Sequence, residues 1–250
     1  MLGLWDNPYC EVFRISAEYE IINPRRTMTP VPLSYFRMPL VLLSVVAVVC
    51  IATVVDPSAG RTSWLLEVGP GLAGIIVLIV LARAGFPMSH MVYFFVFLHV
   101  FILIYGGYYT YAETPLGNWA KEVFSLSRNH YDRVGHIALG VFPAFIIREG
   151  LLRKTPLQRG GWLYFIVISI VLAVAAFWEL IEWWVTLLVA SDVGAAFLGS
   201  QGDIWDAQWD MLVALVGAMV ALPILSRLHD RSIAQLINAQ SSIITSNDST

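Results

Sequence analysis

Six apolar segments, each long enough to cross the roughly 30 Å hydrocarbon core of a bilayer, constrain the fold of this chain most strongly. They lie at 38–55, 67–83, 88–108, 133–150, 161–189 and 206–226. None alternates with a period of two residues, and only helices or closed barrels satisfy their backbone hydrogen bonds in lipid. The predicted fold class is therefore all-α, a polytopic membrane protein built as a bundle of six transmembrane helices.

The composition supports this fold class and excludes others. Hydrophobic residues make up 58% of the 250 residues and charged residues 13%, whereas soluble domains are about half apolar and a quarter charged. The net charge is −3 and the basic residues are scattered, so no nucleic-acid partner is expected. The two cysteines, Cys10 and Cys50, indicate neither a disulfide nor a metal-binding pair.

The distribution of Lys and Arg predicts the orientation. With the N-terminus in the cytoplasm, eleven basic residues fall on the inner side and four on the outer side, which is the bias typical of inner-membrane proteins. Both termini are therefore expected to be cytoplasmic. The predicted organisation is a cytoplasmic N-terminal segment 1–37, a transmembrane domain 38–226 and a cytoplasmic tail 227–250 that is flexible from Ser241. The first 30 residues contain charges throughout, so no cleavable signal peptide is expected.

Under this orientation, histidines and carboxylates from four predicted helices converge at one depth near the outer surface. They are His99; His130, Asp132 and His136 in NHYDRVGH; Glu179 and Glu182 in FWELIEWW; and Asp203, Asp206 and Asp210 in QGDIWDAQWDM. The orientation was inferred from Lys and Arg alone, so the convergence is an independent observation. Carboxylates inside a membrane cost several kcal/mol unless they are paired, hydrated or coordinated.

The spacing of these residues favours a metal site. Asp132 and His136 lie about 40° apart in helical projection, so both can face one point. Oxygen ligands suit Mg²⁺, Mn²⁺ and Ca²⁺, and an added histidine favours Zn²⁺, Mn²⁺ or Fe²⁺. The expected cofactor is therefore a divalent metal, Mg²⁺, Mn²⁺, Ca²⁺ or Zn²⁺. Its predicted ligands come from Asp132, His136, Glu179, Glu182, Asp206 and Asp210.

Other interpretations of the same residues stay open. A hydrogen-bonded network with Arg133 would join the helix ends without a metal, and the same groups could line a proton or ion pathway. Asp203 also fits an N-cap of the last helix. His99, alone on an apolar helix, fits a buried core histidine, and His229 is expected in the cytoplasmic tail, outside the site.

Five motifs, in order between residues 32 and 226, resemble the YjdF-like family of bacterial inner-membrane proteins. They are PLSYF at 32–36, GGYYTYAETPLGNW at 106–119, NHYDRVGHIALG at 129–140, FWELIEWW at 177–184 and QGDIWDAQWDM at 201–211. The resemblance implies a multi-pass inner-membrane protein and draws attention to the same polar stretches. It implies no substrate and no catalytic residue. The first 30 residues lie outside it.

Three functions follow as hypotheses. The first is a metal-dependent enzyme at the outer leaflet that acts on a lipid or a lipid-linked phosphate. His130 or a spare carboxylate would be its general base, and Arg133 would hold an anionic head group. The alternative is a non-catalytic structural or accessory subunit of a membrane complex, and the third is an ion-coupled transporter. The expected partners are membrane lipids and other proteins in the membrane, without nucleic acid. No GxSxG motif or other activated nucleophile is present.

Overall fold

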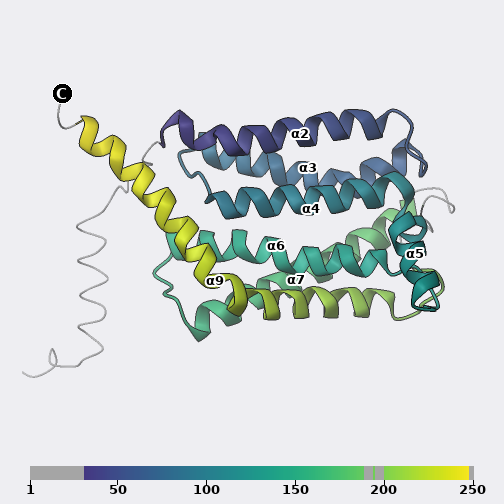
Figure 1. Ribbon diagram of the computed structural model, residues 1–250. Helices are drawn as coiled ribbons and strands as arrows, with labels where there is room; N and C mark the ends of the chain where they lie inside the picture. Colours follow the sequence, from purple (N-terminus) through teal and green to yellow (C-terminus); the bar gives the residue numbers. More distant parts are fainter. Residues whose placement is uncertain (1–30, 189–193, 195–199, 248–250) are drawn as a thin grey trace, which may run out of the picture.

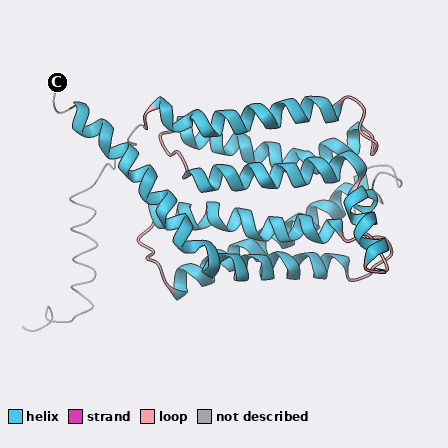
Figure 2. Ribbon diagram, viewed as in Figure 1, coloured by secondary structure: helices cyan, strands magenta, loops and turns pink. Residues whose placement is uncertain are grey.

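Six long helices make up most of the computed structural model, which describes residues 31–188, 194 and 200–247. Within that part of the chain every regular element is helical and no strand occurs (Figure 2). Six helices are long and apolar enough to cross a membrane: α2 (Arg37–Val54), α3 (Arg61–Arg83), α4 (His90–Tyr109), α6 (Tyr131–Lys154), α7 (Gly161–Leu188) and α9 (Asp206–Asn247). The predicted fold class, an all-α bundle of six transmembrane helices, is confirmed.

Short helices complete the bundle at its ends. The 3-10 helix η1 (Leu33–Phe36) runs directly into α2, and η2 (Tyr111–Glu113) and α5 (Pro115–Val123) connect α4 to α6. Proline is well placed at the start of α5, because the first residues of a helix have no intrahelical partner for their N–H groups. Most of the predicted N-terminal segment, residues 1–30, lies outside the described residues.

The six long helices form two layers (Figure 1). Helices α2, α3 and α4 make one layer, α6, α7 and α9 make the other, and α4 packs against α6 between them. We call the end of the bundle where α4 ends and α6 and α9 begin the α5 end. At the opposite end, α4 begins and α6 ends. Whether the α5 end faces away from the cytoplasm remains a prediction from the distribution of Lys and Arg.

Close packing of α6 against α9, within one layer, depends on glycine. A Cβ atom built on Gly140 of α6 would collide with the carbonyl oxygen of Ala214 on α9. A Cβ on Gly217 of α9 would lie 2.9 Å from the carbonyl oxygen of Ile137 on α6. Small residues at membrane helix interfaces allow such backbone approach. The contact holds the start of α9 at one rotation and height relative to α6.

The last helix is longer than its apolar segment. That segment ends at residue 226, whereas α9 continues without interruption to Asn247, so the prediction of a flexible tail from Ser241 is wrong up to that residue. Figure 1 shows the second half of α9 bending away from the bundle, and Pro223, which cannot donate a backbone hydrogen bond, accounts for a kink. Leu236 in this second half packs on Val31 and Tyr35, which anchors it.

Candidate metal centre

The first turns of α6 and α9 and the later part of α7 meet at the α5 end and bring the predicted ligands together. Asp132 and His136 occupy one face of α6, four residues apart. Asp206 and Asp210 occupy one face of α9, also four residues apart. Glu179 on α7 approaches the same point, because its carboxylate lies beside the ring of His136.

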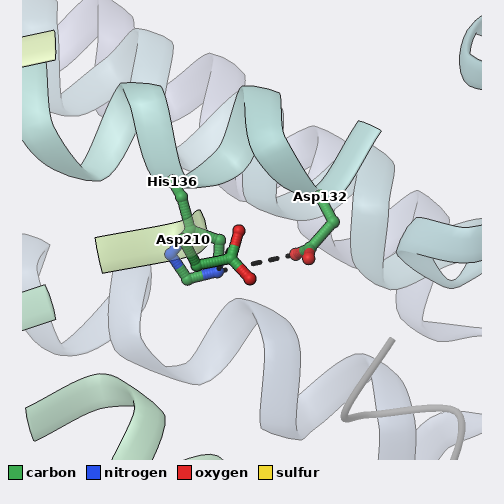
Figure 3. A group of neighbouring side chains, drawn as sticks. All are labelled: Asp132, His136 and Asp210. Carbon is green, nitrogen blue, oxygen red and sulfur yellow. Dashed lines mark ion pairs between the residues drawn. The ribbon is translucent and has the colours of Figure 1, made fainter. Parts of the chain in front are cut away.

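Three side chains form a compact group of potential metal ligands. They are Asp132, His136 and Asp210, which offer one ligand atom each, all within 4.8 Å of one another and all buried. The Nε2 atom of His136 lies 3.5 Å from Asp132 Oδ1 and 3.8 Å from Asp210 Oδ1. Figure 3 shows the three side chains directed toward a common point between α6 and α9.

These separations suit ligands around an ion better than hydrogen-bond partners. Hydrogen bonds of this type are about 2.7–3.2 Å long, shorter than the 3.5 and 3.8 Å found from His136 to its two aspartates. Two ligand atoms at about 2.1 Å from a metal lie about 3.4 Å apart at a tetrahedral angle. The two separations from His136 Nε2 are therefore compatible with ligands around one ion.

The second nitrogen of His136 strengthens this interpretation. His136 Nδ1 lies 3.7 Å from Glu179 Oε1, and each of these buried atoms has no hydrogen-bond partner among the described residues. Metal-binding histidines usually donate their other N–H to a carboxylate, which fixes the tautomer and orients the ring. A small rotation of either side chain would close this pair, leaving Nε2 available as a ligand.

Two arginines bind the aspartates at the start of α9. Arg133 donates to Asp210 in a short contact, to Asp206 at 2.7 Å and to Asp203 at 3.4 Å. Arg128 also donates to Asp206 at 2.7 Å. Asp206, one of the predicted metal ligands, is therefore held between two guanidinium groups, whereas Asp210 Oδ1 contacts both Arg133 and the ring of His136.

Carboxyl groups outnumber guanidinium groups in the cluster around the candidate site. The seven carboxyl groups are Glu67, Asp132, Glu179, Glu182, Asp203, Asp206 and Asp210, and the two guanidinium groups are those of Arg128 and Arg133. The two arginines divide their positive charge between the aspartates of α9 and Asp132, which lies 3.6 Å from Arg133 and 4.0 Å from Arg128, so two cations serve seven carboxyl groups. Buried like charges oppose joint ionisation, and a bound cation relieves that repulsion.

The remaining predicted residues lie near the group without joining it. Glu182 accepts a hydrogen bond from Trp178 Nε1 at 2.7 Å. His130 is half-buried just before α6, where burial and the neighbouring Arg128 and Arg133 lower the pKa of its imidazole. Asp203 accepts from the backbone N–H of Trp205, a turn that precedes α9. The catalytic roles of His130 and Arg133 remain predictions.

One carboxylate of this region was not predicted from the sequence. Glu67 of α3 is 5% exposed and lines the same cavity as Asp132 and Glu182. It is the first residue of the second predicted apolar segment and was not among the predicted site residues. Its signal was present, because an acidic residue inside a membrane helix is costly and usually functional.

The protein and the family that this chain resembles are membrane proteins, in agreement with the fold, and the matched region includes the whole candidate site. A family model described as "predicted membrane protein" (DUF2238) matches residues 38–231, which include every residue of the candidate metal centre. The chain is 40% identical over 173 residues to the inner membrane protein YjdF of Escherichia coli (strain K12), a match that spans 69% of this chain and 82% of that protein. No solved structure matches the chain.

Proposed function

The chain belongs to the DUF2238 family of predicted membrane proteins, and from that premise we propose that it is a divalent-metal-dependent membrane enzyme that acts on a lipid or a lipid-linked phosphate. One observation carries the proposal: Asp132, His136 and Asp210 each direct a ligand atom to a region less than 4.8 Å across. The carboxylate of Glu179 beside the second nitrogen of His136 supports it.

The proposed location follows from the relative and from the charge distribution. The name of the E. coli relative places that protein in the inner membrane, and we extend the same location to this chain. The distribution of Lys and Arg would then direct the α5 end away from the cytoplasm. At that depth the metal centre would lie near lipid head groups, which is why a lipid or lipid-linked phosphate is the proposed substrate class.

The donor set suggests which metals to test first. Two carboxylates and one imidazole make a mixed set of oxygen and nitrogen donors. Such a set suits Zn²⁺ and Mn²⁺, whereas Mg²⁺ and Ca²⁺ prefer sites made of oxygen donors alone. A metal held by three protein groups keeps a position for water or substrate, where it polarises a phosphoryl oxygen or activates the water. Zn²⁺ and Mn²⁺ are therefore our first candidates.

The neighbouring side chains suit the predicted catalytic roles. The lowered pKa of His130 leaves its imidazole neutral near neutral pH, so the ring is able to accept a proton from an attacking water. Arg133 lies between Asp206 and Asp210 and adjoins the metal-ligand group. From this position its guanidinium would offset charge on an anionic head group, in competition with the aspartates that it binds.

A second candidate function rests on the arginines. Arg128 and Arg133 connect α6 and the loop before it to the start of α9 through Asp203 and Asp206. Such a network would join the helices without any metal, as expected for a structural or accessory subunit of a membrane complex. This candidate predicts a metal-free protein that loses stability, and nothing else, when an aspartate is replaced.

Metal analysis separates the two candidates. The protein is purified in mild detergent without chelator, and its metal content is measured by mass spectrometry for the wild type, His136→Gln and Asp210→Asn. Asp203→Asn is the matched control, because Asp203 belongs to the same acidic stretch and contacts Arg133 but is not part of the group around His136.

The enzyme proposal expects about one Zn²⁺ or Mn²⁺ per chain in the wild type and in Asp203→Asn, and almost none in the other two variants. Size-exclusion chromatography checks that all variants are folded. A wild type that binds neither Zn²⁺ nor Mn²⁺, even after incubation with the metal, would refute the metal centre. Metal retained equally by all variants would place the ion elsewhere.

A further inference from the structure

A cavity of about 280 Å³ adjoins the candidate metal centre and extends from it along the interior of the bundle. Helices α3, α4, α6 and α7 line it. Its polar end carries Glu67, Tyr111, Asp132, His136 and Glu182. The cavity therefore includes two of the three metal-ligand residues in its wall, so a molecule bound there would contact the site directly.

Apart from His99 of α4, the rest of the wall is mainly apolar. Val100 and Leu103 of α4, Leu139 of α6 and Val174 and Phe177 of α7 are representative lining residues. An engineered apolar cavity of about 150 Å³ in another protein stays dry and binds benzene. The larger cavity here has room for a longer stretch of hydrocarbon.

The cavity opens sideways from the bundle. Pro70 on α3 and Val174 and Phe177 on α7 line it and are also exposed on the outer surface, Val174 by 40% and Phe177 by 54%. Within the described part of the chain, α3 packs on α4, and α7 packs on α6 and α9, while α3 and α7 have no extensive contact with each other. The opening thus lies between two membrane-spanning helices, where the surrounding medium is the hydrocarbon of the bilayer.

The charge of the wall restricts the head group. Among the described residues that line the cavity, none is Lys or Arg, whereas Glu67, Asp132 and Glu182 are acidic. A free anionic group there would face three acidic residues with no Lys or Arg in the wall to offset its charge. The group at the polar end must be uncharged, as in a long-chain alcohol, or it must have its negative charge compensated by a bound metal.

We propose that this cavity binds the hydrocarbon chain of a membrane lipid, which enters from the bilayer between α3 and α7 and directs its head group to Asp132 and His136. That this lipid is the substrate of an enzyme rests on the proposed function. The chain-binding site itself depends on the apolar wall, its lateral opening and its polar end.

Two glycines of α3 provide a matched pair of variants. Gly74 lines the cavity, and a Cβ atom built on it has no heavy atom within 4 Å, so the Gly74→Leu side chain would extend into open space at the cavity without displacing neighbours. Gly69 has equally open surroundings but is not among the lining residues. Gly69→Leu thus adds the same side chain to the same helix outside the cavity.

The test uses hexadecanol that carries a diazirine in its chain, incorporated into phospholipid vesicles with the purified full-length protein. After illumination, mass spectrometry locates the cross-linked residues. We expect cross-links at lining residues such as Leu139 and Phe177 in the wild type and in Gly69→Leu. In Gly74→Leu this labelling should fall about tenfold. The added side chain would displace part of the bound hydrocarbon chain, and losing the burial of roughly two of its methylene groups weakens binding by about that factor.

Equal labelling of Gly74→Leu and the wild type would overturn the lipid site, as would cross-links confined to outer-surface residues such as Leu40 and Ile224, which do not line this cavity. The same samples are analysed for metal, which separates the two proposals. Labelling of the cavity in a protein that binds no metal would retain the lipid site and refute the enzyme. Stoichiometric metal without cavity labelling would retain the metal centre and refute the lipid site.

Discussion

His229 and Glu149 form a fully buried pair at the end of the bundle opposite the candidate metal centre, with His229 Nε2 3.1 Å from Glu149 Oε2. Arg148 Nη1 lies 2.9 Å from His229 Nδ1. A guanidinium group can only donate, so Nδ1 accepts, and the ring proton must be on Nε2, from which it is donated to Glu149. Glu149 also accepts from the backbone N–H of Ser89 and from Arg153. One carboxylate thus connects the start of α4, the end of α6 and the second half of α9.

Removing His229 should therefore destabilise the whole bundle. His229→Leu would remove one hydrogen-bond partner from Arg148, which keeps Asp230. It would also remove one from Glu149, which keeps Ser89 and Arg153. Leaving a buried polar atom without its partner costs about 1–3 kcal/mol. Thermal unfolding in detergent, followed by circular dichroism, should show a large decrease in midpoint. Arg159→Ala is the control, because Arg159 bonds Asp230 from an exposed position and such pairs contribute less than about 1 kcal/mol. Equal shifts in both variants would contradict the buried network.

The contact between α6 and α9 predicts opposite effects for two glycines of one helix. Gly140→Ala should decrease stability by about 1–3 kcal/mol, since the added methyl group would force the backbones of α6 and α9 apart. Gly150→Ala should be neutral or stabilising, because no heavy atom lies within 4 Å of the added Cβ atom and alanine is the better helix former. Thermal unfolding of the two variants in the same detergent provides the measurement. A stable Gly140→Ala would show that the helices do not approach this closely.

Replacing Arg133 should make stability depend on metal. Arg133→Gln would remove the positive charge that Asp206 and Asp210 share, so the metal-free variant should unfold at a lower temperature than the wild type. If the metal centre exists, Zn²⁺ or Mn²⁺ at about 100 times its dissociation constant should restore about 2.7 kcal/mol. Arg133→Gln combined with His136→Gln should show the same decrease without recovery. Recovery in the double variant would exclude His136 as a ligand.

The spans of the fold could be predicted from hydropathy, because a bilayer selects apolar segments of sufficient length. The segment expected at 88–108 corresponds closely to α4, His90–Tyr109. The predicted helix ends differ from the observed ones where the chain leaves the lipid. There the helical hydrogen bonds continue into polar sequence, which a hydropathy pattern does not mark as helix. The second half of α9, and with it the position of His229 inside the protein, was missed for this reason.

The candidate site could be predicted only as a set of residues. The spacing of Asp132 and His136 predicts that they share a face, because both lie on one helix. Which carboxylate completes the group depends on how α9 is rotated relative to α6. That rotation depends on the contact of Gly140 with Ala214, a packing detail between residues far apart in sequence. The sequence could therefore not distinguish Asp210, which binds Arg133 and also lies 3.8 Å from His136, from Asp206, which binds both arginines.

The environment of His130 predicts a dependence of stability on pH. Its pKa is lowered in the folded protein from the ordinary value of 6.5, by burial and then by Arg128 and Arg133. As the pH falls below that value, the unfolded chain binds a proton before the folded one, so folding stability decreases. Between about pH 7.5 and 5.5 the midpoint of thermal unfolding should therefore fall less in His130→Gln than in the wild type. An identical fall in both proteins would show that His130 titrates normally.

The orientation of the bundle determines which compartment the proposed enzyme serves, and one pair of cysteine variants tests it. In a background with Cys10→Ser and Cys50→Ser, Ser200→Cys places a thiol at the α5 end and Ser241→Cys places one in the second half of α9. The excess of basic residues on the inner side predicts that, in intact cells, a membrane-impermeant maleimide labels position 200 and not position 241. Inverted vesicles should give the opposite pattern, which controls for thiol reactivity. Labelling of position 241 alone in intact cells would place the acidic cluster in the cytoplasm, and a lipid substrate would then have to come from the inner leaflet.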